Sequence, residues 1–154
     1  MARLPEYAIG RAVKGTITMT TSDNADAAPG EYSVEGRRTV ARGDLLFKEG
    51  DAADCAYIVE EGLLEISRAW NGADVIIGTA GPNEMVGEMA LIDKAPRSAT
   101  ARAIRETTLL VVPCEQFEWL LEDTNPVVRR LLERFVAIIR NVNDTNLRLT
   151  LGIR

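Results

Sequence analysis

The stretch that decides the fold spans residues 87–101 and reads GEMALIDKAPRSATA. Gly87 allows a ligand to approach the backbone closely, and a helical turn beginning there would direct unpaired N–H groups outward, where they attract anions. Arg97 adds a planar, permanently charged fork that suits a phosphate, and Ser98 offers a hydroxyl and a backbone N–H. Glu88 would repel a phosphate, so its carboxylate is better suited to accept a hydrogen bond from a sugar hydroxyl. The stretch therefore predicts a pocket for a ribose phosphate.

The whole run resembles the phosphate-binding cassette of cyclic nucleotide-binding domains. That cassette follows the pattern Gly-Glu-x-Ala-Leu, a short spacer and Pro-Arg-Ser/Thr-Ala, and every position is matched here in order. The resemblance implies roles for both ends of the run: ribose contacts from Gly87 and Glu88, with Glu88 on the 2′-hydroxyl, and phosphate contacts from Arg97, Ser98 and Ala99. The remaining cassette residues are Met89, Ala90 and Leu91.

Short segments rich in β-forming residues alternate with Gly, Asp and Pro turns on both sides of the cassette. Asn71-Gly72 is a strong signal for a two-residue hairpin turn. This texture predicts a sandwich or barrel of short strands, at residues 38–41, 45–48, 55–59, 63–70, 74–79, 98–104 and 107–112. The resemblance implies, more specifically, an antiparallel β-roll of the jelly-roll type.

The last third of the chain has a helical pattern. A first helix is expected over residues 115–122, and a long last helix begins after Asn125, a good N-cap, with Pro126 in the first turn. This helix is expected to run to about Arg148 and to end near Gly152, with apolar residues at helical spacing: Val128, Leu131, Leu132, Phe135, Ile138, Ile139 and Val142. This stripe fits core packing, a dimer seam or a lid over the ligand, and we expect Ile138, Ile139 and Val142 to be buried in each case.

The fold class predicted is therefore mainly β with flanking helices, ending in a long helix. We divide the chain into three parts: an N-terminal segment over residues 1–36, a β-roll with the cassette and first C-terminal helix over 37–125, and the long helix over 126–150. Small polar residues predict that the first part is partly flexible, although an edge strand at 16–20 is nearly as well supported. The resemblance covers residues 37–149.

The purine base has two candidate walls, both implied by the resemblance. Hairpin-strand side chains would face the base, namely Ile66, Ile77 and Gly78, and the long helix would offer a polar side chain, with Asn143 and Thr145 as candidates. The alternatives are that the isoleucines belong to the core and that the polar run is a solvated helix end. Ser98 favours cyclic AMP over cyclic GMP, because relatives that prefer cyclic GMP often carry Thr at that position.

Composition narrows the function classes. The 154 residues fit one domain, and the net charge of −5 argues against partners such as nucleic acid or an anionic membrane. With no histidine, a cupin-like metalloenzyme is remote, so we expect no metal and no cofactor. Cys55 and Cys114 lack zinc spacing and are expected to be free thiols, with a bridge left open. Without a signal peptide or a long apolar run, we expect a cytoplasmic protein with no direct membrane insertion.

These observations predict a non-enzymatic sensor of cyclic AMP, or of cyclic GMP, that signals through its C-terminal helix to an unidentified effector protein or domain. A homodimer through that helix is possible. The alternatives are a degenerate β-roll that serves as an interaction or dimerisation module, and the detached ligand-binding piece of a channel or transcription regulator. Ligand titration separates the sensor from the degenerate module.

Overall fold

The computed structural model describes residues 36–150 and residue 152. Apart from Gly36, the N-terminal segment 1–36, with its predicted flexibility and alternative strand at 16–20, lies outside the described residues. Within the described range, no helix is long and apolar enough to cross a membrane.

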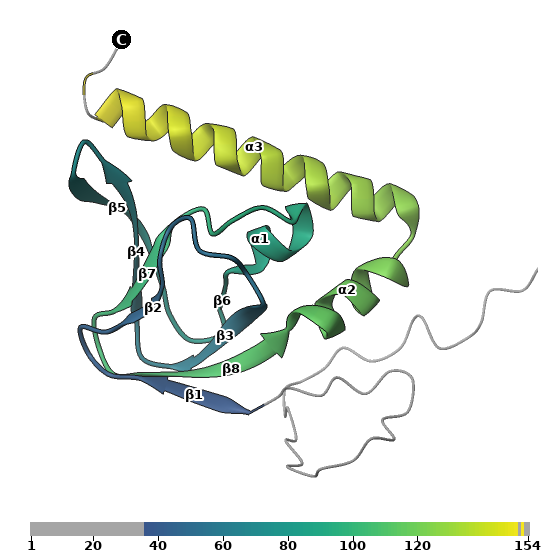
Figure 1. Ribbon diagram of the computed structural model, residues 1–154, viewed down its shortest axis with the longest axis horizontal. Helices are drawn as coiled ribbons and strands as arrows, with labels where there is room; N and C mark the ends of the chain where they lie inside the picture. The colour runs from purple at the N-terminus through teal and green to yellow at the C-terminus, as the bar shows by residue number, and fades with distance from the viewer. Residues whose placement is uncertain (1–35, 151, 153–154) are drawn as a thin grey trace, which may run out of the picture.

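The described chain forms a β-roll of two antiparallel four-stranded sheets (Figure 1). The first sheet has the order β1-β8-β3-β6 and contains β1 (Arg37–Val40), β3 (Cys55–Glu61), β6 (Met85–Val86) and β8 (Thr107–Pro113). The second has the order β2-β7-β4-β5 and contains β2 (Leu45–Phe47), β4 (Leu64–Trp70), β5 (Ala73–Ala80) and β7 (Thr100–Ala103). The predicted antiparallel roll is confirmed. β7 begins two residues later than expected, because the backbone of Arg97 is tied to the β2–β3 loop.

The core lies between the two sheets and draws side chains from both. Val59 of β3, Leu64 of β4 and Leu109 of β8 are completely buried, and the small residues Ala101 and Ala103 of β7 pack among them. Full burial of each large side chain stabilises the fold by about 1.5–3 kcal/mol. The roll is thus held together by alternating inward residues on strands that are far apart in sequence.

The β4–β5 hairpin closes as its sequence predicts. Asn71 and Gly72 both have positive φ angles, 48° and 81°, as a two-residue turn of the favoured twist requires. Further along, Ile66 pairs with Gly78 while Ser67 pairs with Ile76, so that Ile77 is left as a bulge. A bulge bends the strand and disturbs the alternation of its side chains. Ile77 is accordingly 38% exposed.

Three helices accompany the roll in the described residues: α1 (Glu88–Asp93), α2 (Cys114–Glu122) and α3 (Pro126–Thr150). The predicted cap is confirmed, because the Asn125 side chain accepts a hydrogen bond from the Val127 N–H at 2.8 Å. α1 is longer than the single turn expected from the sequence. α3 leaves α2 through a short turn and then crosses the roll, passing over α1 and the β5 hairpin (Figure 1).

α3 presents two different faces. Val136 and Leu147 on the inner face are only 4% and 3% exposed. The opposite face, which we call the outer stripe, consists of apolar residues that are 45–69% exposed: Val128, Leu131, Phe135, Ile138, Ile139, Val142 and Leu149. The expected burial of Ile138, Ile139 and Val142 is therefore not found within this chain. The roll receives the face carrying Val136 and Leu147 instead.

Candidate functional site

The cassette is anchored to the roll at its two ends. Gly87 immediately precedes α1 and has a φ of 82°, in the left-handed region that favours glycine. At the other end, the Arg97 N–H donates to the carbonyl of Asp51 and the Gly50 N–H donates to the carbonyl of Arg97, both at 2.9 Å. The β2–β3 loop therefore fixes the backbone from which the Arg97 side chain projects.

The Arg97 guanidinium reaches back across the cassette to Gly87. Its Nη1 donates to the Gly87 carbonyl at 2.9 Å, and its Nη2 donates to the Cys55 carbonyl on β3 at 2.6 Å. The group also lies over the Phe47 ring, 4.4 Å from its centroid, which is a favourable cation–π arrangement. Arg97 is only 3% exposed, and its Nε is buried without a hydrogen-bond partner. The side chain is fixed in place and retains an unused donor.

Arg97 lacks a close counter-charge among the described residues. Its nearest carboxylate belongs to Asp54, whose oxygen is 4.0 Å away and whose side chain is 94% exposed. Backbone carbonyls carry only partial charges, and burying a cation without a full partner is costly. An anion such as a phosphate would supply the missing charge. The arrangement has the chemistry of an anion-binding site.

The close approach of Arg97 to the backbone explains why residue 87 is glycine. A Cβ at this position would lie 2.3 Å from the Arg97 Nη1, far inside contact distance. The positive φ angle of Gly87 adds a second requirement for glycine. The first and eleventh residues of the cassette therefore depend on each other.

Glu88, the first residue of α1, provides an acceptor beside this cation. Burial raises the pKa of the Glu88 carboxyl, while its own backbone N–H and the charge of Arg97 act in the opposite direction. No Lys or Arg nitrogen of the described residues lies within the 4.0 Å of an ion pair with Glu88. Its carboxylate is therefore available to accept a hydrogen bond from a hydroxyl. A cation and a hydroxyl acceptor thus stand within one short segment.

The remaining cassette residues are of two kinds, some buried against the roll and others partly accessible. Ala90, Leu91 and Ala99 are 4%, 3% and 6% exposed, whereas Met89 and Ser98 are half-buried. Leu91 packs with Ala56 and Val112 in a second apolar cluster outside the main core. The apolar run of the cassette thus fastens α1 to the first sheet, and Ser98 remains next to Arg97 with part of its surface accessible.

The candidate base residues do not all gather on one side. Ile66 packs partly against the main core, and Gly78 pairs with it on β5, where a Cβ would meet nothing within 4 Å. On α3, Asn143 is half-buried and lies three residues from Arg140 and four from Leu147, both of which contact or face the roll. Thr145 is exposed and lies on the side of the outer stripe. Ile66 and Gly78 are thus paired within the roll, and Asn143 lies on the face of α3 that meets the roll. Thr145 does not lie on that face.

Several contributors to the site were missed from the sequence. The carbonyls of Gly87 and Cys55 have no sequence signature as acceptors, because every residue carries one. Phe47 was recognised only as part of a strand. Arg140 and Asp144 on α3 stand four residues apart, but their partners are 47 and 76 residues away in the chain. Only the packing of distant segments reveals them.

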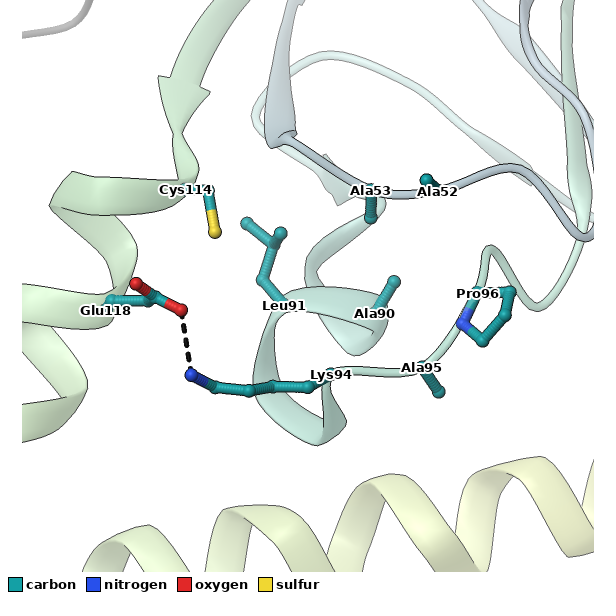
Figure 2. Close-up of a pocket in the computed structure, with 9 residues that line it drawn as sticks. All are labelled: Ala52, Ala53, Ala90, Leu91, Lys94, Ala95, Pro96, Cys114 and Glu118. Atoms are coloured by element: carbon teal, nitrogen blue, oxygen red, sulfur yellow. Dashed lines mark hydrogen bonds and ion pairs between the residues drawn. The ribbon is translucent and has the colours of Figure 1, made fainter.

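A hollow with a volume of about 330 Å³ lies beside α1. Figure 2 shows it framed by α1, the β2–β3 loop and the start of α2, with the Lys94–Glu118 ion pair at one edge. Its lining is mostly apolar and consists of Ala52, Ala53, Ala90, Leu91, Lys94, Ala95, Pro96, Cys114 and Glu118. Neither Arg97 nor Glu88 lines it, so this hollow is separate from the cation and hydroxyl acceptor described above.

The cysteines are free thiols, as predicted. Cys55 belongs to the main core, whereas Cys114 packs against the second cluster, so the two side chains serve different layers. Among the described residues, no group of three or more His, Cys, Asp or Glu side chains is arranged to hold a metal ion.

Comparison with known proteins identifies the family. The family model of the cyclic nucleotide-binding domain matches residues 37–124, which include both sheets and the cassette. The chain belongs to this family. The resemblance to this family that the sequence indicated is thereby confirmed.

Relatives of the domain occur in proteins with different outputs. The cyclic AMP receptor protein of Thermus thermophilus is 32% identical over 116 residues, which cover 75% of this chain and 52% of that protein. The cAMP-dependent protein kinase regulatory subunit of Blastocladiella emersonii is 33% identical over 100 residues, or 64% of this chain and 25% of that protein. The chain thus spans about half, or less, of the length of these relatives.

A solved structure shows the same fold attached to an enzyme. The cAMP-bound form of the EAL enzyme Bd1971 matches 75% of this chain and 32% of its own, with 30% identity and a TM-score of 0.67. The cGMP-bound form of the same enzyme matches 68% of this chain and 28% of its own, with 32% identity and a TM-score of 0.66. The family is therefore mainly regulatory, and its members are in some cases joined to catalytic domains.

Proposed function

We propose that this chain is a regulatory sensor that binds a cyclic nucleotide, with cyclic AMP favoured over cyclic GMP. The observation that carries the proposal is the buried Arg97 guanidinium, held over Gly87 with an unpartnered Nε and no close counter-charge. A cyclic phosphate fits this need, since it brings a full negative charge and acceptor oxygens. The family to which the chain belongs supports the same ligand class.

In this proposal the cassette divides the ligand between its two ends. Arg97 binds the phosphate, with Ser98 and Ala99 beside it, while Gly87 and Glu88 receive the ribose. Glu88 suits the 2′-hydroxyl because its carboxylate is not used in an ion pair. The base extends toward the hairpin and α3, where Ile66, Gly78 and Asn143 are the residues best situated to meet it.

The preference for cyclic AMP rests on Ser98 alone. A threonine at this position is common in relatives that prefer cyclic GMP, and this chain has serine. The matched EAL enzyme has both cAMP-bound and cGMP-bound forms, so likeness to it favours neither base.

Calorimetric titration with cyclic AMP and with cyclic GMP tests the proposal. We expect the wild-type protein to bind both, cyclic AMP more tightly, and Arg97→Ala to lose about 2–5 kcal/mol of binding free energy, as other buried charge pairs do. Arg102→Ala is the matched control, because Arg102 lies on β7 and donates to the Gly43 carbonyl outside the site. Thermal melts establish that each variant is folded.

The absence of binding by wild-type protein at millimolar nucleotide would refute the sensor and favour a degenerate interaction module. If Arg97→Ala does not fold, Arg97→Lys gives the same information. It keeps the charge but puts all its donors on one nitrogen, which cannot span the Gly87 and Cys55 carbonyls as the planar guanidinium does, so weakened binding is expected.

For the output, we propose that α3 also pairs two copies of the chain. Residues of the outer stripe repeat at alternating steps of three and four from Val128 through Leu131, Phe135, Ile138 and Val142, the spacing of a coiled-coil seam. The stripe is half-exposed, continuous over four turns and self-complementary in a two-fold dimer. A second copy is therefore the occupant that the pattern favours. The effector that reads the change is a separate protein or domain still to be identified.

A further inference from the structure

In the described part of the chain, two ion pairs join α3 to α1 and to the roll, and we call them the cassette clamp and the hairpin clamp. In the cassette clamp, Arg140 of α3 binds both carboxylate oxygens of Asp93, the last residue of α1, at 2.5 and 3.0 Å. Its Nη2 also donates to the Pro96 carbonyl at 3.4 Å. The two charged side chains are only 24% and 21% exposed, so water screens this pair less than an ordinary surface pair.

The hairpin clamp lies one helical turn further along α3. Asp144 pairs with Arg68 of β4, which is 20% exposed and also pairs with Glu49 at 3.3 Å. Glu49 in turn accepts a hydrogen bond from the Ala69 N–H at 2.9 Å. Burial lowers the pKa of Arg68, but the hydrogen bonds and charges of Asp144 and Glu49 outweigh it and raise that pKa above the usual value. Arg68 is therefore held between two carboxylates.

Both clamps end next to the backbone of Arg97. Asp93 and Pro96 bracket the loop that leads from α1 into Arg97, and the cassette clamp binds both. Glu49 immediately precedes Gly50, whose N–H donates to the Arg97 carbonyl at 2.9 Å. A movement of the segment that carries Arg97 would therefore disturb the partners of both clamps: Asp93 and Pro96 directly, and Glu49 through Gly50. Figure 2 shows α3 running alongside the loop with Ala95 and Pro96.

The two clamps have opposite polarity, which makes them selective for one position of the helix. On α3, residue 140 is a cation and residue 144 is an anion. The cation pairs with Asp93, and the anion pairs with Arg68. If α3 slid by one turn, so that Arg140 stood opposite Arg68, like charges would meet. The clamps therefore specify the register of α3, which apolar contacts at Val136 and Leu147 alone do not.

We propose that Arg140 and Asp144 are positioning residues that lock α3 across the candidate site in one register, with Asn143 between them turned toward the roll. Because the clamps grip the segments that hold Arg97, docking of α3 and occupation of the site are coupled, and each favours the other. The ligand half of this inference rests on the proposed function. The docking half does not, and it is tested without nucleotide.

Charge reversal provides the test. In Arg140→Glu, two carboxylates face each other, and in Asp93→Arg, two guanidinium groups do. We expect either change to speed amide hydrogen exchange in residues 138–148 of nucleotide-free protein and to weaken cyclic AMP binding, each by about tenfold. The double swap, Arg140→Glu with Asp93→Arg, restores the pairing and should recover both quantities. Recovery distinguishes the clamp from a general loss of stability.

The controls use the same helix and the same conditions. Arg130→Glu reverses an exposed charge on α3 for which the structure has no ion pair, and it should change neither exchange nor affinity. Raising the salt concentration should weaken the wild-type clamps and affect the double swap equally. Thermal melts verify that the single variants remain folded.

The outcomes separate this inference from the proposed function. Faster exchange that the double swap reverses, in a protein that binds no nucleotide, would support the clamps and refute the sensor. Nucleotide binding by the wild type, with exchange and affinity unchanged in both single variants, would overturn the clamps and leave the sensor intact. A double swap that fails to recover either quantity would also overturn the clamps.

Discussion

The cassette and the outer stripe of α3 are both conspicuous in the sequence, yet they relate to the rest of the chain in opposite ways. In the cassette, Arg97 is 3% exposed and bonds to carbonyls of Gly87 and Cys55. In the outer stripe, Phe135 and Ile138 remain 50% and 46% exposed in the single chain. A motif whose partners lie in the same chain fixes a geometry. An exposed apolar stripe indicates that another surface covers it, but it does not identify that surface.

Gly87→Ala should have the largest effect, because it attacks the geometry of the cassette directly. The new Cβ would lie 2.3 Å from the Arg97 Nη1, so the guanidinium must move, and the residue must also hold a φ of 82°. We expect a loss of stability above the roughly 1–2 kcal/mol of the left-handed conformation alone, and at least about tenfold weaker nucleotide binding. Chemical denaturation and calorimetry measure the two effects.

Gly72→Ala is the matched control for that substitution. Gly72 has nearly the same φ, 81°, but a Cβ there would meet nothing within 4 Å. The difference between the two variants therefore isolates the collision with Arg97 from backbone strain. Equal losses of stability in both, with nucleotide binding retained in Gly87→Ala, would show that the Gly87–Arg97 contact does not shape the site.

The outer stripe is tested by Ile138→Asp, whose main effect should be on association. Two copies paired along α3 would bury this aspartate in the seam, so we expect the dimer to dissociate. The monomer should lose no more than about 0.5 kcal/mol, since residue 138 is exposed in the single chain. Sedimentation equilibrium over a range of concentrations measures association, and the melting temperature should lose its dependence on concentration.

Val136→Asp provides the contrast on the inner face of α3. Val136 is 4% exposed, so a charge there should destabilise the fold of each chain and detach α3 from the roll. A wild-type protein that stays monomeric at every concentration would rule out the seam. Dimers that persist in Ile138→Asp would assign the association to another surface.

The same comparison explains how far the sequence could be interpreted. Strand positions, the Asn71-Gly72 turn and the cap at Asn125 depend on neighbouring residues, and they were predicted within one or two positions in most cases. The cassette was predicted as a unit because its residues form one continuous run that resembles the family's pattern. The clamps at Arg140 and Asp144, by contrast, depend on how far α3 turns about its own axis. Helical spacing identified an apolar stripe but could not tell which face meets the roll.

The register of α3 illustrates this limit in physical terms. Seven apolar residues marked one side of the helix, and burial of that side was the natural expectation. Within the chain, however, the inner face is chosen by two long-range ion pairs together with Val136 and Leu147. Such pairs join residues 47 and 76 positions apart, and no local pattern encodes them. Asn143 and Thr145, two residues apart, consequently lie on different sides of the helix.

Glu88→Gln should have the smallest effect on the fold. We expect it to raise the stability of the protein and to weaken nucleotide binding. Burial raises the pKa of Glu88 above its ordinary value of 4.5, so the folded protein holds this proton more tightly than the unfolded chain does. Wild-type stability therefore falls as the pH rises from about 4.5 through the raised pKa, and the loss is complete above it. Glutamine carries no charge and escapes that loss.

The Glu88→Gln variant should become more stable relative to wild type across this interval, while it binds nucleotide more weakly because a charged acceptor for the ribose is gone. Denaturation at a series of pH values, with calorimetry at neutral pH, measures both. A stability difference that shrinks as the pH rises would contradict the raised pKa, and unchanged nucleotide affinity would remove Glu88 from the ribose site.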